Sequence, residues 1–81
     1  MGFTYQATVY VFKELPNGGF DDVAEMNAFR RLNNYRDLKD EVNQYIRDVM
    51  RRSNCLVEVL YERNGEYYDS EEIVCVDGDV A

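Results

Sequence analysis

The fold of this chain can be built on residues 35–53, YRDLKDEVNQYIRDVMRRS. An α-helix turns by about 100° per residue, which gathers the apolar side chains of this stretch within an arc of roughly 100°. These side chains are Tyr35, Leu38, Val42, Tyr45, Ile46 and Val49. Asn34 is a suitable N-cap. The acidic Asp37 is stabilised by the positive end of the helix dipole in the first turn, and the basic residues of the last turn are stabilised by its negative end. The stretch therefore predicts a long amphipathic helix that needs an apolar surface to pack on.

Two further stretches have the period-two alternation of β-strands. One face of residues 3–12 carries Phe3, Tyr5, Ala7, Val9 and Val11. One face of residues 55–61 carries Cys55, Val57, Val59 and Tyr61. The Asn64-Gly65 pair that follows is a strong signal for a type I′ turn, so residues 55–76 are predicted to form a hairpin. A turn is also predicted at residues 16–19, where proline and paired glycines interrupt regular structure.

The register of this hairpin has two alternatives. A regular ladder would place Glu58 directly opposite Glu71, and like charges in that position are unfavourable. A bulge near residues 69–70 would remove this pair and set Cys55 against Cys75. We favour the bulge.

Residues 22–32 give a weaker pattern. The apolar residues Val23, Met26, Phe29 and Leu32 recur at every third position. Each such step drifts by about 60° around a helix, so these residues cannot continue the apolar face of residues 35–53. We predict a short helical or irregular segment at 22–32, with a break at Asn33-Asn34.

These elements predict a small single domain, residues 1–81, of the α+β class. The order is β-α-β-β, with one long amphipathic helix packed on a three-stranded, mostly antiparallel sheet. A right-handed crossover would place residues 3–12 parallel to residues 55–61, with the third strand between them. Residues 77–81 are predicted to form a frayed acidic tail.

The net charge of −7 is confined to one part of the chain. Residues 1–53 hold eight acids and eight bases, whereas residues 54–81 hold eight acids against Arg63 alone. This asymmetry indicates an acidic surface directed at a basic partner. Direct nucleic-acid binding is not expected, because it requires a basic stripe.

Catalytic machinery is scarce. The chain has no histidine, no G-x-S-x-G sequence and no glycine-rich phosphate loop. Adjacent residues of a strand point to opposite faces, so Glu71 and Glu72 cannot share one site. We therefore expect no enzymatic activity, no catalytic residues and no cofactor.

Metal ions and membranes are also unexpected partners. Cys55 and Cys75 do not form a C-x-x-C motif, and we expect both to be buried reduced thiols. The hairpin acids lack the spacing of a calcium-binding loop. The sequence has neither an apolar run of spanning length nor the features of a signal peptide. We expect a cytoplasmic protein, in the host cytoplasm if a phage encodes it.

The second face of the sheet is the candidate for function. It would carry Tyr10, Phe12, Leu56, Leu60 and Tyr67 interleaved with Glu58, Glu62 and Asp69. Either this face is exposed and binds a partner, or residues 22–32 fold over it as a second layer. If it is exposed, the predicted partner-binding residues are Glu58, Leu60, Glu62, Glu66, Tyr67, Asp69 and Glu71.

This character is similar in type to the small acidic inhibitors that phages and mobile elements encode against restriction, CRISPR or repair enzymes. The likeness implies a nucleic-acid mimic, of the anti-CRISPR or anti-restriction kind, that occupies a basic surface of a host protein. Carboxylates repeating along one strand face lie about 6.5–7 Å apart, within the range of spacings along a nucleic-acid backbone. The alternative is a structural or adaptor protein that forms a homodimer through the sheet face or an edge strand.

Overall fold

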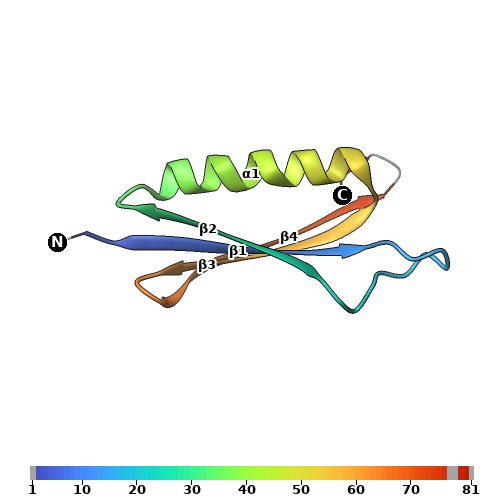
Figure 1. Cartoon of the computed structure of the whole chain (residues 1–81), viewed down its shortest axis with the longest axis horizontal. Coiled ribbons are helices and arrows are strands. Elements are labelled where there is room, and N and C mark those ends of the chain that lie inside the picture. The colour runs from blue at the N-terminus through green and yellow to red at the C-terminus, as the bar shows by residue number, and fades with distance from the viewer. Residues whose placement is uncertain (1, 77–78, 81) are drawn as a thin grey trace.

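An antiparallel sheet carries a single long helix on one of its faces (Figure 1). The structure is a computed structural model, and it describes residues 2–76 and 79–80. The elements are β1 (Thr4–Lys13), β2 (Glu25–Leu32), α1 (Tyr35–Arg52), β3 (Cys55–Arg63), β4 (Glu66–Val76) and the two-residue β5 (Asp79–Val80). The strand order in the sheet is β2-β1-β3-β4-β5. This confirms the predicted α+β class, with four long strands in place of three.

The additional strand is β2, and the helical or irregular segment predicted for residues 22–32 is wrong. β2 pairs with β1 in an antiparallel register that sets Ala7 against Phe29. Apolar residues at every third position of a strand alternate between its faces, so Phe29 lies on the helix side and Met26 on the other. Only Phe29 in β2 is partly buried. β2 is therefore held by its ladder with β1 more than by an apolar pattern of its own.

β2 also changes the topology. The chain returns along β2 to the starting end of β1 before α1 begins, so α1 runs back across the sheet and β3 enters antiparallel to β1. β1 and β3 are direct neighbours, and β4 lies outside them. The predicted parallel crossover, with the third strand in the middle, is therefore wrong.

The boundaries of α1 follow from its caps. The side chain of Asn34 accepts a hydrogen bond from the Asp37 N–H over 3.0 Å, which satisfies one of the free donors of the first turn. Asn33 has a φ of 57° and turns the chain from β2 into the helix. Its side-chain oxygen accepts from the Phe3 N–H over 2.6 Å. At the other end Ser53, predicted as the last helical residue, is the extended C-cap.

The core lies between α1 and the facing side of the sheet. The buried face of α1 consists of Leu38, Val42, Ile46 and Val49. It packs on the buried side chains Ala7, Val9, Val11, Cys55, Val57, Val59, Tyr61 and Cys75. Both cysteines are buried free thiols, as the sequence predicted. The period-two and helical patterns of the sequence thus define the same core from its two sides.

The hairpin register confirms the predicted bulge. Cys55 lies opposite Cys75, and the register shifts between Tyr61 and Glu62, which leaves Tyr68 as the extra residue. The positive φ angles of Asn64 and Gly65, 51° and 81°, fit the type I′ turn.

The predicted acidic tail is wrong where the structure describes it. Asp79 and Val80 form β5 and pair with Val76 and Cys75. The rest of the predicted tail, residues 77, 78 and 81, lies outside the described residues.

Candidate protein interface

The face of the sheet opposite α1 is called here the open face. Side chains alternate along each strand, so the register assigns every strand residue to one face. The open face comprises Thr4, Gln6, Thr8, Tyr10, Phe12, Met26, Ala28, Arg30, Leu32, Leu56, Glu58, Leu60, Glu62, Tyr67, Ser70, Glu72 and Val74. In the part of the chain that the structure describes, no second layer covers it (Figure 1). Residues 22–32 widen the sheet instead of covering it.

The open face is organised in rows that cross the strands. One row consists of Met26, Tyr10, Glu58 and Glu72. The next consists of Ala28, Thr8, Leu60 and Ser70, and the one after that of Arg30, Gln6, Glu62 and Tyr67. Along β3, leucines therefore alternate with glutamates, and Tyr10 on β1 and Tyr67 on β4 lie in the same rows as these glutamates. Tyr67 is 69% exposed and Met26 64%, so both offer side-chain area to a partner.

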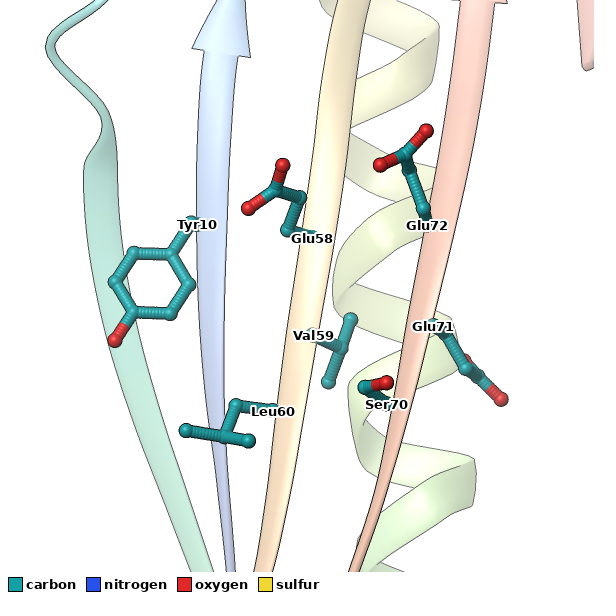
Figure 2. A pocket seen from close by; sticks show the side chains of 7 residues that line it. All are labelled: Tyr10, Glu58, Val59, Leu60, Ser70, Glu71 and Glu72. Carbon is teal, nitrogen blue, oxygen red and sulfur yellow. The ribbon is translucent and has the colours of Figure 1, made fainter. Parts of the chain in front are cut away.

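Glu58 and Glu72 lie directly opposite each other on β3 and β4. The bulge removes the Glu58–Glu71 pair expected from a regular ladder, but it creates this second like-charge pair. The two glutamates border a shallow hollow of about 500 Å³ together with Tyr10, Leu60 and Ser70 (Figure 2). The hollow is open to solvent and presents two carboxylates beside an aromatic ring.

Charges on the two sides of the sheet are balanced differently. On the helix side, ion pairs among the described residues join Lys13–Glu25, Arg31–Glu41, Lys39–Glu71 and Arg51–Asp48. On the open face, Glu58, Glu62 and Glu72 form neither an ion pair nor a hydrogen bond with a described residue. The only base among the described residues of this face is Arg30, which donates to Gln6 Oε1 over 3.0 Å. The open-face acids are therefore uncompensated.

The predicted partner-binding residues are divided between the two faces. Glu58, Leu60, Glu62 and Tyr67 lie together on the open face. The register places the other three, Glu66, Asp69 and Glu71, on the helix side. Glu72 takes their place on the open face. The presence of the bulge selects Glu72 over Glu71, and the predicted list missed it because it kept the residue that a regular ladder would expose.

One of the helix-side acids, Glu71, lies beside the ring cluster of Tyr35, Tyr61 and Tyr68. Glu71 Oε1 lies 3.0 Å from Lys39 Nζ. This hydrogen bond raises the pKa of Lys39. Lys39 also lies over the ring of Tyr61, 5.9 Å from its centroid. Burial raises the pKa of Tyr61, and the nearby Glu71 charge raises it further. Glu71 thus links β4 to α1 through its ion pair with Lys39, and it does not contribute to the open face.

None of the family models, curated proteins or solved structures compared with this chain matches it. Within residues 2–76 and 79–80, no helix has the length and apolarity needed to cross a membrane. The same residues contain no cluster of three or more acidic or cysteine side chains that could hold a metal ion.

Proposed function

We propose that this chain is a non-enzymatic acidic binding protein whose open face docks on a basic surface of another protein. The observation that carries the proposal is the contrast between the two sides of the sheet. Four acids on the helix side, Glu25, Glu41, Asp48 and Glu71, are paired with cations, whereas none of Glu58, Glu62 and Glu72 on the open face is.

A basic partner would relieve the repulsion between Glu58 and Glu72. Side chains directly opposite on antiparallel strands have Cβ atoms about 4.5–5.5 Å apart, so Glu58 and Glu72 repel each other in the free protein. A lysine or arginine of the partner placed between the two carboxylates would replace this repulsion with two attractions. Binding energy would then include the relief of a cost that the free protein carries.

Tyr10, Leu60 and Tyr67 give the same surface apolar contact area. Aromatic side chains are enriched at protein interfaces, and charged groups around them set orientation and association rate. This combination suits a basic protein surface that offers both cations and apolar side-chain stems. A surface that normally holds nucleic acid has this character, so the proposed class is an inhibitor that mimics nucleic acid.

The test uses two double variants that change the net charge equally. Glu58→Lys/Glu62→Lys alters the open face, and Asp22→Lys/Asp40→Lys alters exposed acids away from it. Each immobilised protein is used to capture partners from a cell lysate, and the affinity for each purified partner is measured by calorimetry at low and high salt. We expect the open-face variant to bind about tenfold or more weakly and the control to bind as the wild type does.

The class of inhibitor is tested on the same partner. The wild-type chain should displace nucleic acid from it, and the open-face variant should not. Equal loss of binding in both double variants would mean that net charge alone acts, without a localised surface. Unchanged binding in the open-face variant would refute the proposed function.

A further inference from the structure

The outer edge of β4 carries backbone groups that no neighbouring strand satisfies. Asn64 N–H donates to Thr4 O over 2.8 Å, so the even-numbered residues of β3 direct their backbone groups to β1. The odd-numbered residues of β3 therefore bond to β4, and their partners are Asp69, Glu71, Ile73 and Cys75. By the same alternation, Ser70, Glu72 and Val74 direct their N–H and C=O groups outward.

Two observations support this orientation. Ser70 N–H donates to the Oδ1 atom of its neighbour Asp69 over 2.9 Å, so it is not part of the ladder with β3. β5 pairs with the outer edge at Cys75 and Val76. Elsewhere along β4, no described strand occupies this edge. The edge therefore accepts an added antiparallel strand at one end and, among the described residues, its outward backbone groups over residues 70–74 are free apart from the Ser70 N–H, which bonds to Asp69.

The charges of β4 select what could be added there. β4 contains the acids Glu66, Asp69, Glu71 and Glu72 and no base. Glu72 projects on the open face and Asp69 on the helix side, so both faces of an added strand would meet carboxylates. The opposite edge of the sheet, β2, contains Glu25 against Arg30 and Arg31. The two free edges are therefore not equivalent.

We infer that residues 70–74 of β4 accept an extended, lysine- or arginine-rich segment of the protein partner as an additional β-strand. Backbone hydrogen bonds to the Ser70 C=O and to the N–H and C=O groups of Glu72 and Val74 would provide affinity, and the acids on both faces would select basic side chains. Because Glu72 belongs to the edge and to the open face, such a segment would continue the interface of the proposed function, on which this inference rests. A second copy of the chain is a poor occupant, since each copy carries a charge of −7.

The test compares two peptides of equal length and charge. One alternates lysine with valine and can form a β-ladder. The other alternates lysine with proline, whose fixed φ of about −65° holds the chain in a polyproline II conformation and whose missing N–H removes half of the backbone donors, so it does not form a regular β-ladder. We expect the lysine–valine peptide to bind about tenfold more tightly, because only it gains the ladder hydrogen bonds. It should also slow amide hydrogen exchange at Glu72 and Val74, and the lysine–proline peptide should not.

An edge-blocking variant supplies the matched control. Val74→Pro keeps the charge and removes an outward N–H that does not bond to β3, so the sheet can be retained. It should reduce binding of the lysine–valine peptide to the level of the lysine–proline peptide. The exchange measurement on the wild-type protein decides the matter if this variant does not fold.

Equal binding of the two peptides, or no slowing of exchange at Glu72 and Val74, would overturn the inference. So would exchange at these amides that slows with protein concentration alone, because it would indicate self-pairing. The variant Glu58→Lys/Glu62→Lys separates the two proposals. If the peptides bind equally and this variant loses both, the edge inference fails and the proposed function stands. If the ladder is formed but natural partners bind this variant normally, the proposed function fails instead.

Discussion

At the scale of single residues, the opposed pair Glu58 and Glu72 makes a stability prediction. Replacing Glu72 by Gln removes the like-charge pair and should raise the free energy of unfolding by about 0.2–1 kcal/mol. The control Glu62→Gln changes the net charge equally, but Glu62 lies opposite Tyr67 and has no such pair. Urea denaturation at low salt measures both variants. An equal gain in unfolding free energy for Glu62→Gln and Glu72→Gln would show that stability depends on net charge alone and not on the opposed pair.

The hydroxyl of Tyr61 gives a second prediction at this scale. Tyr61 is fully buried, and its hydroxyl has no hydrogen-bond partner among the described residues. Tyr61→Phe should therefore raise the free energy of unfolding by about 1 kcal/mol. The control is Tyr45→Phe, because the Tyr45 hydroxyl accepts from Asn27 Nδ2 over 2.6 Å and its loss should cost about 0.5–1.5 kcal/mol. A comparable loss at Tyr61 would mean that its hydroxyl bonds to Glu71.

The sequence analysis listed Glu71 as an open-face residue, whereas Glu72 takes that position, and this difference shows the limit of sequence reasoning for single residues. Strand alternation correctly places Glu58, Leu60 and Glu62 together, because β3 is regular over its whole length. Beyond a bulge, every later side chain changes face relative to a regular ladder. The favoured bulge near residues 69–70 therefore already implied Glu72 on the open face, and the predicted list kept Glu71, which fits only the regular ladder. The extra residue is Tyr68, and the register from Ser70 onward is the same. Ring contacts with Tyr5 and Tyr35, absent from any local pattern, accompany that position.

At the scale of elements, the packing of α1 on the sheet predicts the effect of a buried charge. Val42 is fully buried in the middle of α1. Val42→Asp should cost about 3–5 kcal/mol and unfold this small domain, because the new carboxylate has no cation beside it. Gln44→Asp places the same group on the exposed side of α1 and should leave the domain folded. Thermal melting followed by circular dichroism distinguishes them, and a Val42→Asp protein that melts close to the wild type would contradict this arrangement.

The hairpin predicts the reactivity of the cysteines. Cys55 and Cys75 are 0% and 1% exposed, and burial raises the pKa of the Cys55 thiol, which lowers the fraction of reactive thiolate. Both thiols should react with a maleimide only after denaturation, as followed by mass spectrometry. Rapid reaction in the native protein would show that β3 and β4 separate readily at this end. A mass lower by two hydrogens before labelling would instead reveal a cross-strand disulfide.

Among the elements, β2 could not be predicted from the sequence, and the reason is physical. α1, β1 and the hairpin bury regular stripes of side chains, and those stripes are visible in the sequence. An edge strand with one partly buried side chain has no such stripe. Its pairing depends on hydrogen bonds to β1 and on contacts such as Phe29 with Tyr45, which join distant residues.

At the scale of the whole molecule, the charge asymmetry is visible in the sequence but its placement is not. The sequence assigns the net charge of −7 to residues 54–81. The structure separates the acids between residues 58 and 72 into an uncompensated group on the open face and a group on the helix side that includes the Lys39–Glu71 ion pair. The base of this region, Arg63, lies over the rings of Phe3 and Tyr68 on the helix side. The charged side chains on the open face of the hairpin are therefore all acidic.

The most direct test of the central claim is carboxylate labelling of the chain, free and in complex with a captured partner. A water-soluble carbodiimide with an amine modifies exposed carboxyl groups, and mass spectrometry locates them. We expect Glu58, Glu62 and Glu72 to be labelled in the free chain and protected in the complex, with Asp22 and Asp40 labelled equally in both. Protection of Asp22 or Asp40 with continued labelling of the three open-face glutamates would contradict the account.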